Sequence, residues 1–433
     1  MSVFFLVGMA SGPARADETP TVTAQLQTLI DTNRALQDQL TAQQKAIDDL
    51  KARLASLELG SGRAQASLPA AEPPASDSTS PSLPASDSGL GVRIGGEGGV
   101  AYFLTGRDGA FPNGAFRWDD AKLYLDASVW KDVYFYSELD LMTREASDQN
   151  VHFGEMYIDF ENVSSLWQAD RLVNVRVGRF YDPFGEEYQV RGVMENPLIA
   201  HSASDIWGMD QGIELYGQSG RVSYAAALMD GGVSRLNTAH DDKSIAGRIG
   251  FDPGGGVHLS ASGMWTGWIN APNDVLSAIW FGNGFFRAIS PAATRFEASL
   301  EELDASYRWK GGRASVAGGL VQFDDNVRGD SRNMSYYTFE ATQYLFDRLY
   351  GAVRFSGIRA PGGYPIAGLG NFEDYFFSSI LTSELYRLSI GVGYQFAAPV
   401  ELKFDYSPEW GRTTAGGGRD REDLFSTELG VKF

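Results

Sequence analysis

The chain has 433 residues, a formal net charge of −19 and no cysteine. The missing thiols exclude disulfides and thiolate chemistry, and the acidic balance argues against nucleic acid, whose recognition needs a basic surface. The remaining composition, with 50 glycines and 12% aromatic residues, fits a soluble all-β protein or a membrane barrel that hides apolar side chains at every second position.

The first element is an apolar run over residues 2–10, which is too short to cross a bilayer as a helix. It is followed by Pro13-Ala14-Arg15-Ala16, which matches the small-x-small pattern that signal peptidases cut. We therefore interpret residues 1–16 as a signal peptide and expect export.

Residues 22–59 form the next element, and neither Gly nor Pro interrupts it before Gly60. Its seam positions are spaced 3-4-3-4, which predicts a self-associating α-helical coiled coil in the periplasm. A single amphipathic helix packed on a globular core is the alternative. Asn33 falls at an a position, where Asn often favours two strands, so the coil alone leaves the oligomer number open. The seam consists of Leu26, Leu29, Asn33, Leu36, Leu40, Gln43, Ile47, Leu50, Leu54 and Leu57.

Residues 60–90 are rich in Ala, Pro and Ser and include five prolines. Such a composition cannot bury a core, so we expect an extended linker.

Residues 91–433 alternate between apolar and polar side chains with period two, as in Val-Glu-Leu-Lys-Phe-Asp-Tyr-Ser over 400–407. Segments of about ten residues match the length that a tilted strand needs to cross a bilayer. The pattern predicts an all-β membrane protein, a 16-stranded antiparallel transmembrane β-barrel. The segments begin near Val92, Lys122, Val133, His152, Leu172, Gln211, Arg221, Ser244, Val257, Phe296, Arg313, Ser335, Leu349, Glu384, Val400 and Leu424.

The links between these segments alternate in length. Short links include 130–132, 218–220 and 310–312, whereas 181–210 and 267–295 are long. A barrel with short periplasmic turns and long outer loops requires this parity, and a soluble sandwich does not. The link over 161–171 is an exception.

Aromatic residues are expected at both rims of the barrel, with Trp130, Trp309 and Tyr350 at the short-turn side and Trp118 and Trp265 at the opposite side. The chain ends on Phe433 within an alternating strand, which looks like the signal that the outer-membrane assembly machinery reads.

Catalytic patterns are missing from the sequence. The four histidines, His152, His201, His240 and His258, lack metal-ligand spacing, and no Gly-x-Ser-x-Gly occurs. Acidic loop clusters such as 420–423 could take calcium, but they are more often solvated turns. We therefore expect no enzymatic activity, cofactor or metal site.

The loop between the fifth and sixth segments carries the most specific motif. Residues 175–185 read Val-Arg-Val-Gly-Arg-Phe-Tyr-Asp-Pro-Phe-Gly, and Glu186-Glu187, Met194-Glu195 and 210–213 follow. These residues resemble the phosphate-selective porins O and P, and the resemblance covers roughly residues 91–215. It implies an outer-membrane homotrimer in contact with lipid, in which this third long loop folds into the lumen.

The resemblance further implies passive diffusion of small hydrophilic solutes or ions, with anions such as phosphate as candidates. A structural protein that ties the outer membrane to an envelope partner through the coiled coil is the alternative. The acids Glu186 and Glu187 are candidate opposing charges. The candidate pore-lining cations are Arg176, Arg191, Arg248, Arg287, Arg354 and Arg359.

Overall fold

The computed structural model describes residues 91–106, 111–142, 151–231, 242–270, 294–327, 332–364, 381–418 and 423–433. The expected signal peptide, coiled coil and linker lie outside the described residues and stay predictions.

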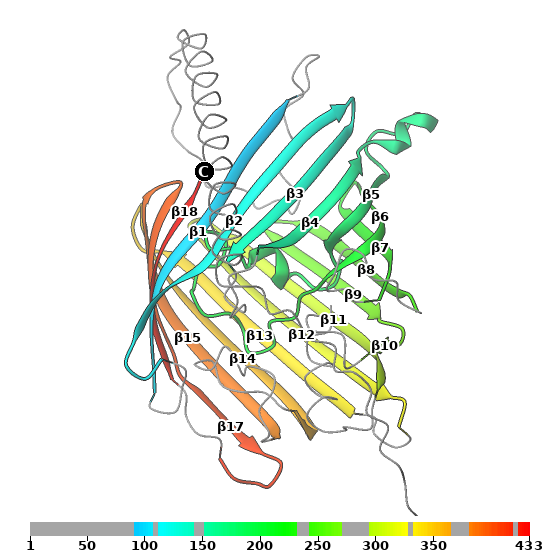
Figure 1. Ribbon diagram of the computed structural model, residues 1–433. Coiled ribbons are helices and arrows are strands. Elements are labelled where there is room, and N and C mark those ends of the chain that lie inside the picture. The colour runs from blue at the N-terminus through cyan, green and yellow to red at the C-terminus, as the bar shows by residue number, and fades with distance from the viewer. Residues whose placement is uncertain are drawn as a thin grey trace, which may run out of the picture. The chain divides into compact units, whose positions relative to one another are not determined.

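The strands of the described residues form one antiparallel sheet, and most of them are labelled in Figure 1. Strand β1 pairs with both β2 and β18, so the sheet closes on itself. Two labelled strands, β10 and β17, continue the courses of β9 and β16, because β9 and β10 both pair with β11, and β16 and β17 both pair with β15. Eighteen labelled strands therefore make a 16-stranded barrel, as the sequence predicts.

The strands of the sheet are β1 Val92–Thr105, β2 Ala115–Trp130, β3 Val133–Met142, β4 His152–Phe160, β5 Asn174–Tyr181, β6 Met209–Ser219, β7 Val222–Met229, β8 Ser244–Gly254, β9 Val257–Trp265, β10 Ile269–Asn270, β11 Arg295–Trp309, β12 Gly312–Asp325, β13 Arg332–Tyr344, β14 Leu349–Tyr364, β15 Thr382–Ala397, β16 Val400–Ser407, β17 Glu409–Thr413 and β18 Leu424–Lys432. Several begin at the predicted residue, including β3, β8 and β16. Strand β2 begins seven residues before the predicted Lys122, since its first residues already pair with the end of β1 through Ala115 and Phe103.

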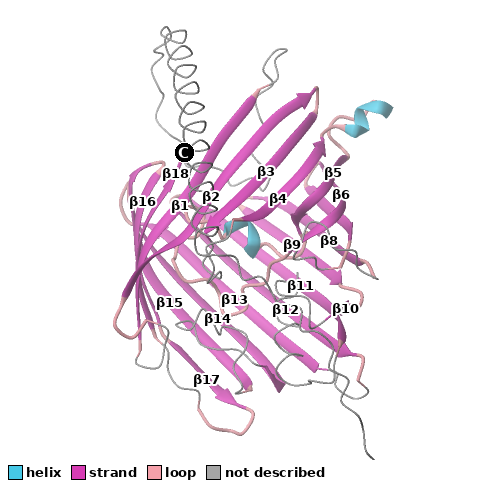
Figure 2. Ribbon diagram, in the orientation of Figure 1, coloured by secondary structure: helices cyan, strands magenta, loops and turns pink. Residues whose placement is uncertain are grey.

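Two short 3-10 helices interrupt the strands, η1 over Val163–Trp167 and η2 over Glu187–Val190 (Figure 2). Among the described residues, no helix is long and apolar enough to cross a membrane. The first helix occupies the exceptional link of 161–171, where the Ser164 hydroxyl accepts hydrogen bonds from the backbone N–H groups of Leu172 and Val173.

Burial is inverted relative to a soluble protein. On β16, Lys403 and Asp405 are 1% and 3% exposed, whereas Phe404 and Tyr406 between them are 42% and 45% exposed. Polar side chains therefore point inward and apolar ones outward, which is the arrangement that a hydrocarbon surrounding favours.

The predicted aromatic rims are confirmed for four of the five residues. Trp130, Trp309, Trp118 and Trp265 are exposed on the barrel. The prediction for Tyr350 is wrong, because its side chain is buried on the inner face and its hydroxyl donates to Glu401. Its position at the rim did not determine which face of the strand it occupies.

Candidate functional site

The connection between β5 and β6, residues 182–208, folds into the barrel and is called the inner loop below. Its helix η2 lies within the ring of strands in Figure 2. Two features of the sequence make the turn inward: Pro183 fixes the backbone where the loop begins, and Gly185 adopts a φ of +68°, which favours glycine. The Gly185 N–H then donates to the Ser262 hydroxyl on β9 at 3.0 Å. The loop thus crosses from β5 toward β9 at its start.

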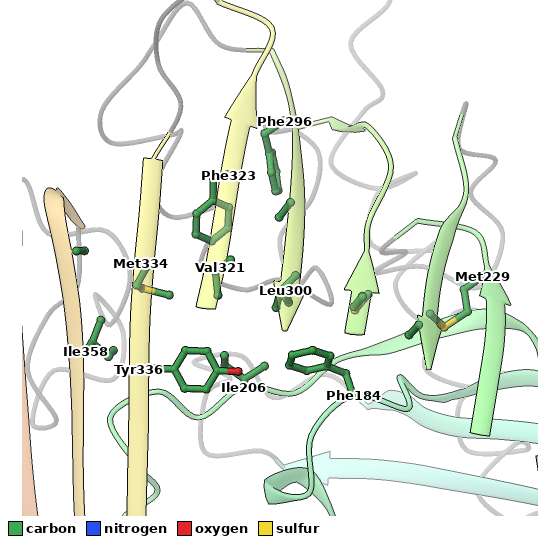
Figure 3. Packing of buried hydrophobic residues seen from close by; sticks show 14 of the residues in the cluster. Phe184, Ile206, Met229, Phe296, Leu300, Val321, Phe323, Met334, Tyr336 and Ile358 are labelled. Carbon is green, nitrogen blue, oxygen red and sulfur yellow. The ribbon is translucent and has the colours of Figure 1, made fainter. Parts of the chain in front are cut away.

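Apolar side chains of the inner loop pack on the inner wall. Phe184 and Ile206 point toward Leu300 and Tyr336, which belong to β11 and β13 (Figure 3). The wall is apolar here because Phe296 and its neighbours replace the polar residues found elsewhere on the inner face. Burial of these groups removes apolar area from water on both surfaces and stabilises the inward position of the loop.

Three buried cations on the inner wall bind backbone carbonyl groups of the loop. Arg354 on β14 donates to the Ala200 carbonyl at 2.6 Å, and Arg387 on β15 donates to the Ser202 carbonyl at 2.7 Å. Lys403 on β16 donates to the Val193 carbonyl at 2.6 Å. We call these three residues the anchor cations.

Each anchor cation also pairs with a buried glutamate. Arg354 pairs with Glu340, Arg387 with Glu409 at 2.8 Å, and Lys403 with Glu428 at 2.8 Å. A buried charge is tolerated only when it is paired and hydrogen-bonded, and here the carboxylate supplies the charge while the loop carbonyl groups supply further acceptors. The cations therefore hold the loop and are not free for a solute.

Two further contacts fix the middle of the loop. Asp405 Oδ2 accepts hydrogen bonds from the N–H groups of Ile199 and Ala200, at 2.9 and 2.8 Å. Val193 lies above Gly99 and Gly430, which face each other across the β1–β18 pair. A methyl group on Gly430 would come within 2.7 Å of Val193 Cγ1, so the two glycines leave the space that this side chain fills.

The loop carries its own charged cluster. Arg191 Nε donates to Asp205 Oδ1 at 2.7 Å, its guanidinium lies 4.5 Å from the Trp207 ring centre, and His201 Nδ1 lies 3.1 Å from Asp205 Oδ2. Burial alone would raise the pKa of Asp205, but Arg191 and His201 hold it well below its usual value. Burial and the neighbouring Asp205 charge raise the pKa of Glu187 to about 7.

On the part of the inner wall away from the anchor cations, the cationic side chains are more exposed. The side chains of Lys122 on β2, Arg176 on β5 and Arg248 on β8 are 13%, 14% and 15% exposed, against 1% for Arg387 and Lys403. Arg176 lies between the rings of Tyr157 and Tyr216, 4.2 and 5.0 Å from their centres. This wall presents its cations at the lumen surface.

Carboxylates pair with these wall cations. Arg176 pairs with Asp159 at 3.1 Å and Glu214 at 3.2 Å, and both acids are less exposed than the arginine. Arg248 donates to the Gly185 carbonyl at 2.7 Å and lies 3.4 Å from Glu186. Although burial opposes it, the hydrogen bond from His258 and the charge of Arg248 lower the pKa of Glu186.

The predicted site residues fall into three groups. Arg176, Arg191, Arg248, Glu186 and Glu187 gather at the inner loop and the wall that faces it. Arg287 lies outside the described residues, so its role stays a prediction.

Two of the predicted pore-lining cations are corrected. Arg354 is 4% exposed and lies beneath the loop as an anchor. Arg359 lies on β14, not in a loop, and its side chain is 61% exposed on the outer face, since inward positions of this strand are even-numbered. Sequence reasoning missed Arg387, Lys403 and Asp405, whose only signal was their place on a polar strand face.

Comparison with known proteins gives similarity at the level of the fold. No family model and no curated protein matches the chain. It is similar to the outer membrane channel DcaP of Acinetobacter baumannii, with a TM-score of 0.54 and 11% identity over 80% of this chain and 99% of that chain.

The trimer form of OmpT, an outer membrane protein of Vibrio cholerae, gives a TM-score of 0.53 and 10% identity over 80% of this chain and 100% of that chain. OmpF of Salmonella typhi gives a TM-score of 0.51 and 10% identity over 79% of this chain and 97% of that chain. These similarities show that the chain has the closed 16-stranded barrel of outer-membrane porins.

Proposed function

We propose that the chain is an outer-membrane channel through which small hydrophilic solutes diffuse passively, down their gradient. The inner loop carries the proposal, because 16-stranded barrels are wide enough to hold water and a loop fixed inside one narrows the passage. The three anchor cations and Asp405 bind the inner loop to the barrel wall, so the constriction has a fixed position in the barrel.

Anions are the proposed preferred solutes, and phosphate is the one that the resemblance to the porins O and P suggests. Support comes from Lys122, Arg176 and Arg248, whose side chains are more exposed than most of the acids that pair with them. Glu186, the exception at 26% exposure, and Glu195 at 37% lie on the loop as opposing charges. With cations on one wall and acids on the facing loop, the passage has an electrostatic field directed across it, which acts on a charged solute as it passes.

Planar-bilayer recordings test the channel and its selectivity separately. The purified full-length protein should give stepwise conductance, and its reversal potential across a potassium chloride gradient should have the sign of chloride preference. Absence of conductance from correctly folded barrels would overturn the channel, whereas potassium preference would overturn only the anion selectivity. Addition of phosphate should reduce chloride current if phosphate occupies the constriction.

We propose that the chain forms a trimer, because the similar OmpT structure is a trimer form and because the porins O and P that the sequence resembles are trimers. Mass measurement of the detergent-solubilised protein checks it. Under this proposal the chain is not an enzyme, and the purified barrel should hydrolyse neither ester nor peptide substrates.

A further inference from the structure

The outer face of the barrel carries a row of polar residues where β13 to β17 approach the long loops. Ser335 pairs with Arg359, Arg359 with Glu384, and Glu384 with Arg412, so these four residues lie at one level across four adjacent strands. Arg359 and Arg412 are exposed, and Glu384 lies 3.4 Å from Arg359. We call this the arginine row.

Two residues along each strand, closer to the middle of the barrel, the next outward-facing residues are mostly aromatic. Tyr337, Gly357, Tyr386 and Trp410 are register partners across the same four strands. The rings of Tyr386 and Trp410 lie 6.1 Å apart, and both stack on Phe355 one level further in, at 6.5 and 6.2 Å. Aromatic side chains gather where hydrocarbon meets headgroups, which places the arginine row at headgroup depth.

We propose that the arginine row binds a phosphorylated lipid headgroup of the outer leaflet. Guanidinium groups match phosphate oxygens with two parallel hydrogen bonds and suit this role better than ammonium groups. The Arg412 side chain makes no hydrogen bond or ion pair within the described residues. Arg359 contacts the partly exposed Glu384 and the hydroxyl of Tyr386 beside it. Two cations against one acid leave a positive balance on this patch.

The spacing of the two arginines fits one diphosphorylated headgroup or two neighbouring headgroups. They stand on β14 and β17 with β15 between them, so their backbones are about 10 Å apart at two strand spacings. Glu301 lies on the same level five strand spacings from Arg412, with Leu320 and Ser335 between it and Arg359. The acid thus limits the patch on one side and does not neutralise it.

Lipid binding by the purified full-length protein in detergent tests the proposal. Native mass spectrometry would follow retention of diphosphorylated lipid A, its dephosphorylated form and phosphatidylcholine. The double variant Arg359→Gln/Arg412→Gln should bind diphosphorylated lipid A about tenfold or more weakly than the unaltered protein, because charged hydrogen bonds to phosphate are lost. Arg348→Gln is the matched control: it removes the same charge from an exposed arginine at the opposite end of β14 and should bind normally.

Three outcomes would overturn the proposal: equal binding by the double variant, equal binding of the dephosphorylated lipid, or displacement of lipid A by millimolar inorganic phosphate, which would mark a site for free anions. Conductance of the double variant should be unchanged, since both side chains lie outside the lumen. An unchanged conductance would also show that the variant folds. A failure of the lipid site can then be distinguished from a failure of the channel.

Discussion

Arg387 on β15 donates a hydrogen bond from Nη1 to the backbone carbonyl of Ser202 at 2.7 Å, although 185 residues separate them in the chain. Nη2 of the same guanidinium lies 2.8 Å from Glu409. One buried side chain therefore links two strands of the wall to the inner loop. The position of the constriction depends on such contacts, because the strand ladders themselves do not extend into the loop.

Replacement of Arg387 by Met should loosen the inner loop and raise the single-channel conductance. The variant loses the hydrogen bonds that Arg387 donates to the carbonyl groups of His201 and Ser202. It also leaves Glu409 buried without its cation, and breaking a buried ion pair in this way typically costs about 3–5 kcal/mol of folding stability. Planar-bilayer recordings provide the measurement. Adding Glu409→Gln should recover part of the stability but not the original conductance, and an unchanged conductance in Arg387→Met would contradict the anchoring role.

Asp405→Ala should expose the amides of Ile199 and Ala200 to exchange. Each amide loses a hydrogen bond to a charged acceptor, worth about 1.5–3 kcal/mol, so local opening should become at least about tenfold more frequent. Hydrogen–deuterium exchange measures it. Ser407→Ala is the control, since Ser407 is the next inward residue of β16 and, within the described part of the chain, its hydroxyl bonds Ser389 at 2.7 Å and no residue of the loop. Equal exchange in both variants would argue against the contact.

Period-two alternation predicted the barrel and the opposed polar and apolar faces of strands such as 400–407 correctly, because lipid outside and water inside impose opposite demands on neighbouring residues. It could not separate Arg176 from Arg387, since both occupy inward polar positions. Only the path of the inner loop decides that Arg387 is covered and Arg176 is not. Arg359 was misplaced for a different reason: the sequence does not show that β14 extends as far as Tyr364, and the residue's odd position on this strand turns it outward.

The inner loop should be more tightly held at pH 5 than at pH 8. Glu187 has a pKa of about 7 in the folded loop against an ordinary value of 4.5, so between these values the folded protein binds more protons than the unfolded one. Its contribution to stability therefore falls as the pH rises from 4.5 to 7. Exchange of the Ser202 amide, which donates to Glu187 at 3.3 Å, should speed up accordingly after correction for intrinsic rates.

Glu187→Gln is the variant that tests the source of this pH effect. It keeps an acceptor for the Ser202 hydroxyl but cannot ionise beside Asp205, so it should reduce the difference between pH 5 and pH 8. Glu195→Gln changes an exposed acid of the same loop and should keep the difference. A pH effect of full size in Glu187→Gln would assign it to another group, such as Asp182, whose pKa burial also raises.

Removing the partly exposed wall cations should reduce the preference for anions. Arg176→Gln leaves Asp159 and Glu214 without their common partner, and Arg248→Gln removes the arginine beside Glu186, which keeps its contact with His258. The reversal potential in a potassium chloride gradient should therefore move toward the potassium value. The shift should shrink at 1 M salt, where the screening length is about 3 Å. Arg348→Gln, at an exposed turn, should leave the potential unchanged, and an equal shift there would refute a local effect.

Gly430→Ala should displace the inner loop while the wall stays intact. The added methyl group would approach Val193 Cγ1 to 2.7 Å and Met194 Sδ to 3.1 Å, but the nearest backbone atom is 3.9 Å away. Since the β-branched Val193 has few alternative rotamers, the backbone of the loop has to move to relieve the clash. Gly263→Ala adds the same group where the nearest atom is 3.9 Å away, and it should conduct normally. A changed conductance in Gly430→Ala alone would show that the loop is seated on the seam between β1 and β18, whereas normal conductance in both variants would mean that Val193 does not set the width of the passage.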